Sequence, residues 1–369
     1  MKILQIIPTI SSGGGERFTV DLCNELAKRG HEVTLCVLFP LEGTYAFYVD
    51  DVLQSVRLVS LNKKVGIDIG CIIKTYRFIK SYKPDVVHTH LRAITYVILS
   101  IFKKIKFFHT VHNEAHIEAE TFIDKVLRNI LFKSKLVTPV TISPESRLSF
   151  RGFYKMDAPI ISNGRNVPSN LDVSKGVKEE IKRYKKNDST KVIVHLAHLD
   201  EVKRQDLLAR VARRLYDEGY NFSILFIGAI RIKEYEEKVR SLMPPCAYIL
   251  GERKNPLEYL KEAGAYALCS KYEGLPISLI EALGVGAIPI CMPLGGIPNL
   301  VTSGENGLLS VDLEEESYYV LMKKYLDMSD NETRDMRNRA IVSYRPYSMT
   351  ECAEKYESLY YKILNQKVI

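Results

Sequence analysis

The stretch AYALCSKYEGLPISLIEALGVGAIPICM, residues 265–292, has the pattern of a strand, a helix and a second strand in order. Two short apolar runs, 265–270 and 287–292, flank a longer apolar segment that begins near Pro276. Proline is well tolerated in a first helical turn, because the N–H group that it lacks would have no helical partner there. A strand, a helix and another strand in succession predict two parallel strands joined by a crossover. The stretch therefore predicts an α/β fold.

The same alternation continues along the whole chain. Further strands are expected at 2–8, 32–39, 56–61, 85–90, 106–112, 136–143 and 159–164, and then at 191–199, 222–228 and 247–251. A helix is expected at 16–30, because its apolar residues recur on one face and Gly30 ends the pattern. Alternation of this kind predicts doubly wound parallel sheets with helices on both faces.

A polar, charge-rich passage at 166–190 interrupts the alternation and is the best candidate for a domain boundary. A chain of 369 residues is also long for a single core. We therefore expect an N-terminal domain over 1–168 and a C-terminal domain over 169–345. In such sheets ligands bind at the carboxyl ends of the strands, so two facing domains would frame a cleft.

The composition limits the class of protein. Hydrophobic residues make up 46% and charged residues 26%, which is ordinary for a globular chain. The net charge of +8 suits an acidic small molecule, an anionic membrane surface or nucleic acid, and does not choose among them. Seven scattered cysteines without a C-x-x-C motif predict reduced core residues. With no secretion signal and no apolar run long enough for a bilayer, we expect a cytoplasmic protein.

A glycine-rich loop follows the first strand, in the segment PTISSGGGERF at 8–18. Glycines before a helix that opens at Glu16 favour an anion cradle, because helix N–H groups and the helix dipole point at the ligand. A plain tight turn is the alternative. A dinucleotide motif fails, because Phe18 stands where the third glycine is needed and no acidic residue ends the second strand. A redox cofactor is therefore not expected.

Glu273 and Glu281 lie eight positions apart around the start of a helix. From these residues alone they could be the acid and base of a hydrolase, metal ligands, or groups that bind hydroxyls. The N–H groups around Gly274 would face an anion, as in the glycine-rich loop.

In order along the chain, these features resemble the GT-B glycosyltransferases of family 4, which are retaining enzymes that use nucleotide sugars. The motifs that carry the resemblance lie at 13–35, 84–90, 110–113, 161–168, 195–208, 226–228 and 273–290. The resemblance implies two Rossmann-like domains facing across a cleft. It also implies that a closing helix in 346–369, with the motif at 347–364, crosses back to the N-terminal domain.

The resemblance further implies roles for single residues. Glu281 would bind the ribose hydroxyls, and Lys203 would neutralise the pyrophosphate. Glu273, as a catalytic residue, would hold the donor sugar and phosphates together with Gly274 and Leu275. The glutamates are then binding groups, and no glycosidase pair or metal is required.

The N-terminal half would complete the site. His112 would be catalytic and touch the donor sugar near the reacting carbon, and the loop with Gly14 and Gly15 would close on the phosphates. The remaining residues implied at the cleft or the acceptor are Glu16, Asn163 and Gly164.

One position departs from the family pattern. His198 stands where the family usually has an arginine that pairs with Lys203 on the pyrophosphate. Either Arg204 supplies the missing charge, or the bound diphosphate protonates His198, or activity is weakened.

Several histidines raise the alternative of a zinc site. His88, His90, His109, His112 and His116 cluster near expected strand ends, and the last two would share a helix face. His90 and His109 are expected to be half-buried, and no cysteine or carboxylate is spaced to complete a site. We therefore expect no metal.

The resemblance implies that the acceptor binds mainly to the N-terminal domain, which carries basic and apolar stretches at 100–108 and 124–136. The second predicts a helix that could lie on an anionic membrane, with Lys125, Arg128 and Lys133 toward the headgroups. An ordinary solvated helix face is the alternative. The membrane interpretation points to a lipid-linked saccharide acceptor in bacterial surface-polysaccharide assembly. Rival hypotheses are a nucleotide-sugar epimerase and a non-catalytic nucleotide-sugar-binding subunit, and no motif suggests a nucleic-acid partner.

Overall fold

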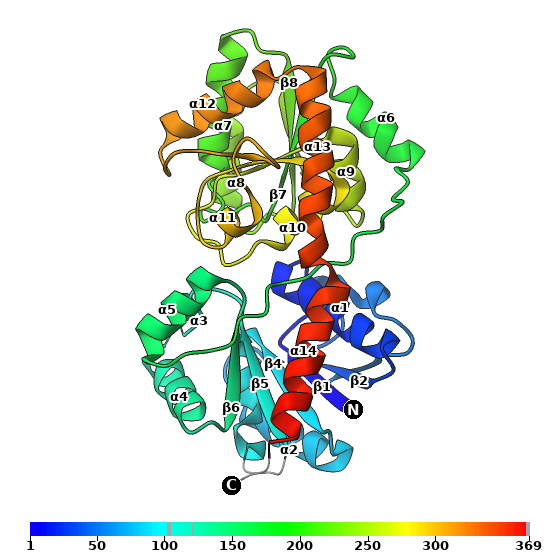
Figure 1. Cartoon of the computed structure of the whole chain (residues 1–369), viewed down its shortest axis with the longest axis vertical. Coiled ribbons are helices and arrows are strands. Elements are labelled where there is room, and N and C mark those ends of the chain that lie inside the picture. Colours follow the sequence, from blue (N-terminus) through cyan, green and yellow to red (C-terminus); the bar gives the residue numbers. More distant parts are fainter. Residues whose placement is uncertain (102–104, 120, 367–369) are drawn as a thin grey trace. The chain divides into compact units, whose positions relative to one another are not determined.

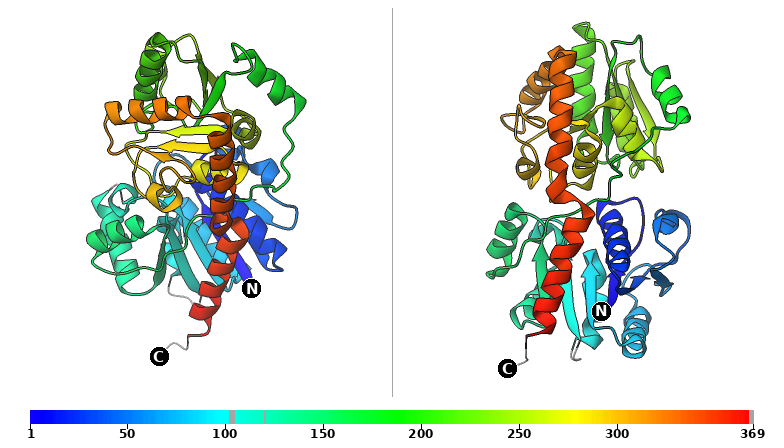
Figure 2. Two further views of the ribbon diagram at one scale, coloured as in Figure 1. Left: turned by 45° about the horizontal axis from the view of Figure 1, so that its top comes forward. Right: turned by 45° about the vertical axis from the view of Figure 1, so that its right-hand side comes forward.

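A computed structural model describes residues 1–101, 105–119 and 121–366. The chain divides into two compact units. The first unit consists of Met1–Asn166 together with the chain from Tyr347 onward, and the second is Val167–Pro346. Each unit is a parallel sheet with helices on both sides (Figures 1 and 2).

The sheet of the first unit has six parallel strands in the order β3-β2-β1-β4-β5-β6. The chain order reverses between β1 and β4, the place where doubly wound sheets bind ligands at their carboxyl edge. The strands are β1 (Lys2–Ile7), β2 (Glu32–Val37), β3 (Arg57–Ser60), β4 (Val86–His90), β5 (Lys106–Val111) and β6 (Val137–Thr141).

The helices of the first unit include the last helix of the chain, α14, which contacts α1 (Figure 1). Tyr356 and Tyr360 of α14 are fully buried, and Glu357 pairs with Arg29 at 2.6 Å. The returning helix is thus part of the core of this unit. The α-helices are α1 (Gly14–Lys28), α2 (Ile69–Tyr82), α3 (Ala115–Glu118), α4 (Phe122–Lys133), α5 (Pro144–Tyr154) and α14 (Met349–Leu364), and the longest 3₁₀ segment is η3 (Leu91–Ser100).

The sheet of the second unit repeats the same topology, in the order β12-β11-β10-β7-β8-β9. Its strands are β7 (Lys191–Leu196), β8 (Phe222–Ile227), β9 (Ala247–Gly251), β10 (Ala265–Leu268), β11 (Ile288–Cys291) and β12 (Leu308–Leu309). Its helices are α6 (Lys175–Arg183), α7 (Gln205–Asp217), α8 (Lys233–Leu242), α9 (Pro256–Ala263), α10 (Ile277–Val285), α11 (Ile297–Leu300), α12 (Glu315–Asp327) and α13 (Asp330–Tyr344).

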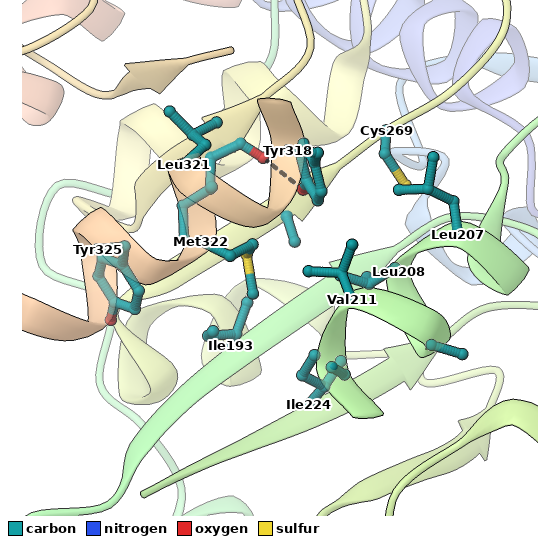
Figure 3. Packing of buried hydrophobic residues seen from close by; sticks show 14 of the residues in the cluster. Ile193, Leu207, Leu208, Val211, Ile224, Cys269, Tyr318, Leu321, Met322 and Tyr325 are labelled. Atoms are coloured by element: carbon teal, nitrogen blue, oxygen red, sulfur yellow. Dashed lines mark hydrogen bonds between the residues drawn. The ribbon is translucent and has the colours of Figure 1, made fainter. Parts of the chain in front are cut away.

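The core of the second unit lies between its sheet and the helices α7 and α12 (Figure 3). Ile193 of β7 packs with Leu208 of α7 and Met322 of α12, all of them fully buried. The hydroxyl of Tyr318 donates to the carbonyl of Ile290 at 2.9 Å, so this buried polar group is satisfied.

Two details differ from the sequence prediction. Residues 159–164 form no strand, because only Ile160 makes an isolated bridge, to Thr141. The strand β12 was not predicted, since two residues give no periodic pattern. Of the cysteines, six are buried and Cys246 is partly buried, and all are free thiols. Within the described ranges, no helix is long and apolar enough to cross a bilayer.

Candidate active site

The candidate donor-binding residues of the second unit lie in the loops after β7 and β10, the neighbouring strands where the order reverses, and in helix α10. Nζ of Lys203, in the loop after β7, lies 2.8 Å from Oε1 of Glu273, in the loop after β10. Ser270 donates to the same oxygen at 2.6 Å. Glu273 is nearly buried, while the Lys203 side chain remains 23% exposed. The pair joins two loops 70 positions apart and leaves the cation accessible to an anionic ligand.

Hydrogen bonds within the loop after β7, and from Lys271 to it, define its conformation. Oδ1 of Asp200 accepts from the backbone N–H groups of Val202 at 3.0 Å and of Lys203 at 3.2 Å. The N–H of Lys271 donates to the carbonyl of Val202 at 2.7 Å. These contacts fix the position of the lysine relative to Glu273.

Helix α10 begins directly after Pro276, as the sequence predicts, and is buried on nearly all its faces. Gly274 and Leu275 lie in the loop before it, so the positive end of the helix dipole lies beside Glu273. Glu281 is 5% exposed in the second turn of this helix. Burying a carboxylate is costly unless it is hydrogen-bonded. Hydroxyl groups of a ligand could donate such hydrogen bonds to Glu281.

The sequence analysis did not identify a glycine pair that packs against the backbone of Glu273 and Gly274. Gly295 has φ +54°, and a Cβ there would lie 1.9 Å from the carbonyl oxygen of Glu273. The N–H of Gly296 donates to the carbonyl of Gly274 at 2.7 Å. Only glycine permits both this backbone conformation and this close approach. Two adjacent glycines at 295–296, between β11 and α11, are the sequence feature that could have indicated this close backbone contact.

His198 and Arg204 have distinct surroundings. Nδ1 of His198 is buried and has no hydrogen-bond partner within the described residues. Burial, followed by the charges of Arg231 and Lys203, lowers the pKa of His198 to about 4, so the ring is neutral at pH 7. Nη1 of Arg204 donates to the carbonyl of Leu313 at 3.0 Å. Its guanidinium group is therefore held by the backbone after β12.

In the first unit, the glycine-rich loop connects β1 to α1. Gly13 is the N-cap of α1, and its missing side chain leaves room for Glu16, whose Oε2 would lie 2.1 Å from a Cβ. Ser11 donates to Oε1 of Glu16 at 3.1 Å. Gly14 and Gly15 form the first turn, and a Cβ at Gly15 would lie 3.3 Å from Leu91. A side chain at Gly13 would displace the Glu16 carboxylate from this loop, and one at Gly15 would press on Leu91.

His112 directly follows the carboxyl end of β5 and is 8% exposed. Its ring lies 5.4 Å from that of Phe18 in α1, which brings it near the glycine-rich loop. Its backbone N–H donates to Oε1 of Glu118 at 3.0 Å. Burial lowers the pKa of His112 to about 4, so the ring is neutral at pH 7.

Asn163 and Gly164 are buried beside the start of α14. A Cβ at Gly164 would lie 2.6 Å from Cβ of Cys352 and 2.8 Å from the carbonyl oxygen of Ser348. Gly164 therefore allows the returning helix to approach.

Several expectations about the histidines and α4 are wrong. His90 and His109 are fully buried, and His112 does not share a helix with His116. No group of three possible metal ligands occurs in the described part of the chain. Arg128 faces inward and donates to Glu118 at 3.1 Å. The buried carboxylate of Glu118 would be costly without a cation as its partner. Arg128 cannot reach lipid headgroups.

The rest of α4 has two apolar faces. Leu131 and Phe132 pack inside, while four side chains point outward: Phe122, Ile123, Val126 and Ile130, with exposed fractions of 79%, 76%, 40% and 57%. Residues 102–104 of the other basic stretch lie outside the described residues.

Two family models match the chain, together spanning residues 12–342. Glycosyltransferase Family 4 matches residues 12–195, and Glycosyl transferases group 1 matches residues 176–342. The capsular polysaccharide biosynthesis glycosyltransferase CapH of Staphylococcus aureus is 27% identical over 76% of this chain and 78% of its own length.

A GalNAc-alpha-(1->4)-GalNAc-alpha-(1->3)-diNAcBac-PP-undecaprenol alpha-1,4-N-acetyl-D-galactosaminyltransferase of Campylobacter jejuni is 24% identical over 99% of both chains. Among solved structures, Anabaena HepE in complex with UDP and glucose superposes with a TM-score of 0.80. It is 14% identical and aligns with 98% of this chain and 100% of its own.

Proposed function

Because this chain belongs to glycosyltransferase family 4 and has the GT-B fold, we propose that it moves a sugar from a nucleoside-diphosphate sugar to a hydroxyl of a saccharide or lipid-linked saccharide. The observation that carries the proposal is the pair of Lys203 and Glu273 beside the start of α10. A cation and a helix N-terminus suit a diphosphate leaving group, on which negative charge grows in the transition state.

In this proposal the bond between the anomeric carbon and the phosphate oxygen breaks, and its electrons leave with the diphosphate. The acceptor oxygen bonds to the same face of that carbon, and its proton passes to the departing phosphate oxygen. Lys203 neutralises the diphosphate, Glu273 and Glu281 hold hydroxyls of the donor, and His112 contacts the donor sugar. No protein nucleophile takes part.

The nature of the acceptor is proposed from two sources. The relative from Campylobacter jejuni acts on an undecaprenol-linked saccharide, as its name states, and the relative from Staphylococcus aureus acts in capsule synthesis. On this chain, the exposed apolar side chains of α4 lie on the same helix as Lys125 and Lys133. Apolar groups bordered by cations suit the surface of an anionic membrane. We therefore place the enzyme in the cytoplasm, peripherally on the inner membrane face, in bacterial polysaccharide synthesis.

The decisive experiment measures nucleoside-diphosphate release from UDP-glucose, UDP-galactose, UDP-N-acetylglucosamine, UDP-N-acetylgalactosamine and GDP-mannose. Each donor is assayed with and without a bacterial lipid extract, and the sugar product is checked for its anomeric configuration. We expect release from one donor, increased by the lipid. Conversion of a donor to its epimer without any acceptor would indicate an epimerase, and tight donor binding without release would indicate a binding subunit.

A further inference from the structure

Polar side chains of β1, β4 and α14 join the ring of His112 in a buried chain of hydrogen bonds. The hydroxyl of Tyr360 lies 2.6 Å from Nδ1 of His88 and 3.3 Å from Nε2 of Gln5. Oε1 of Gln5 lies 2.8 Å from Nε2 of His90, and Nδ1 of His90 lies 3.0 Å from Nε2 of His112. We call these five residues the His112 relay. All its members except His112 are fully buried.

The amide of Gln5 determines which ring nitrogens carry protons. Its oxygen accepts from Nε2 of His90, so that nitrogen bears the proton. Burial lowers the pKa of His90 well below its usual value, so the ring is neutral and its Nδ1 has no proton. Nδ1 must therefore accept, and Nε2 of His112 must donate to it. His112 is then protonated at Nε2 and unprotonated at Nδ1.

The other branch of the relay agrees with this direction. Nε2 of Gln5 donates to the oxygen of Tyr360, which leaves the hydroxyl proton of Tyr360 to donate to Nδ1 of His88. Nε2 of His88 then donates to Oγ1 of Thr110 at 2.8 Å. All three rings therefore carry their proton on Nε2. The opposite direction requires the Gln5 amide to turn over and every ring to change tautomer together.

Nδ1 of His112 forms no hydrogen bond to any side chain or backbone group among the described residues. We propose that the returning helix fixes the tautomer of His112 through Tyr360, Gln5 and His90, so that Nδ1 accepts a hydroxyl proton of the bound donor sugar. The inference rests on the proposed role of His112, and it makes Gln5 and Tyr360 positioning residues that touch no substrate.

The tautomer can be measured without substrate, by ¹⁵N NMR of histidine-labelled full-length enzyme at neutral pH. His112→Asn assigns the signals of His112 by their loss. In the wild type we expect His88, His90 and His112 to be protonated at Nε2. In Tyr360→Phe and in Gln5→Leu we expect His112 to divide between its two tautomers. Tyr361→Phe is the matched control, because Tyr361 is 45% exposed on the same helix.

The second measurement is nucleotide release from the active donor of the panel. An even division between tautomers halves the competent population, and loss of ring orientation adds to this, so kcat should fall roughly two- to tenfold with little change in KM. Nδ1 protonation of the wild-type rings, or an unchanged His112 tautomer in both variants, would overturn the relay whatever the turnover. A changed tautomer with unchanged kcat would leave the relay standing and overturn the role of His112 at the donor.

Discussion

The ammonium group of Lys203 and Oε1 of Glu273 lie 2.8 Å apart, with the hydroxyl of Ser270 on the same oxygen. The contact joins the loops after the two strands at which the sheet order reverses. A bound diphosphate would offer the lysine a stronger partner, because phosphate oxygens carry more negative charge than one shared carboxylate oxygen. The ion pair thus holds the lysine in place before the donor binds.

Replacement of this lysine should weaken use of the donor. Hydrogen bonds to charged groups contribute about 1.5–3 kcal/mol, so we expect Lys203→Gln to lower kcat/KM roughly ten- to hundredfold. Steady-state nucleotide release measures the effect. Lys178→Gln, at an exposed position of α6, is the charge-matched control. Equal kcat/KM values for the two variants would contradict the role of Lys203.

Gly295→Ala should displace the backbone of Glu273. Both Gly295 and Gly219 have positive φ, but a Cβ at Gly219 meets nothing within 4 Å. Alanine at either position carries the conformational strain, of about 1 kcal/mol, and only Gly295→Ala adds the clash. We expect Gly295→Ala to abolish most donor binding, measured by calorimetry. Gly219→Ala should lower the free energy of unfolding slightly and leave donor binding unchanged. Normal donor affinity in Gly295→Ala would show that the glycine does not support the site.

His198→Arg should restore the cation that the family pattern has at this position. The neutral ring of His198 offers no positive charge to a diphosphate above about pH 5, since its pKa is lowered to about 4. We expect the arginine variant to bind its donor roughly tenfold more tightly, from one additional charged hydrogen bond. Titration of donor affinity measures this. Asn338→Arg, on the exposed face of α13, adds the same net charge elsewhere and should have no effect. An arginine at 198 without gain would mean that the site does not face the diphosphate.

The outward face of α4 should determine membrane binding. We expect the double variant Phe122→Ser with Ile123→Ser to reduce binding to vesicles that contain phosphatidylglycerol by tenfold or more, since each buried aromatic or aliphatic side chain contributes roughly 1.5–3 kcal/mol. Vesicle sedimentation measures it, with pure phosphatidylcholine as the uncharged reference. Val342→Ser, which removes an apolar side chain that is 58% exposed on α13, is the control. Unchanged binding would leave α4 an ordinary solvated helix.

Stability should begin to fall on acidification near pH 6.5, because a buried histidine stays neutral in the folded chain. His195 is fully buried, with its Nδ1–H donated to the carbonyl of Ala267 at 2.9 Å, and burial lowers its pKa to about 4. The unfolded chain therefore takes up the proton first, near pH 6.5, and the folded chain only near pH 4. Between these values the free energy of unfolding should fall by up to roughly 1.4 kcal/mol per pH unit for this histidine.

Urea unfolding at pH 7.5, 6.5, 5.5 and 4.5 measures this slope. His195→Asn keeps a donor toward the same carbonyl without a titrating ring and should make the slope smaller, while buried His90 and His112 still contribute to it. His116→Asn, at an exposed histidine, should leave the slope unchanged. Identical slopes in all three proteins would remove His195 as a cause.

The sequence alone determined the alternating strands, the start of α10 at Pro276 and the loops that carry Lys203 and Glu273. These features are local, because turn residues, helix starts and apolar periodicity act within a few positions of one another. The failed strand at 159–164 shows the limit of such evidence. Of its apolar residues only Ile161 is buried, and Ile160 makes a single isolated bridge to Thr141 in place of a strand ladder.

Tertiary structure decided which residues support the site. Gly295 lies 22 positions from Glu273, and Tyr360 lies 272 positions from His88, so no local pattern connects them. The same holds for Arg128, which looks like a solvated cation in its helix and is buried against Glu118. Burial and hydrogen-bond partners, and hence pKa and tautomer, depend on which distant segments pack together, because a polar group removed from water must find its partner within the fold.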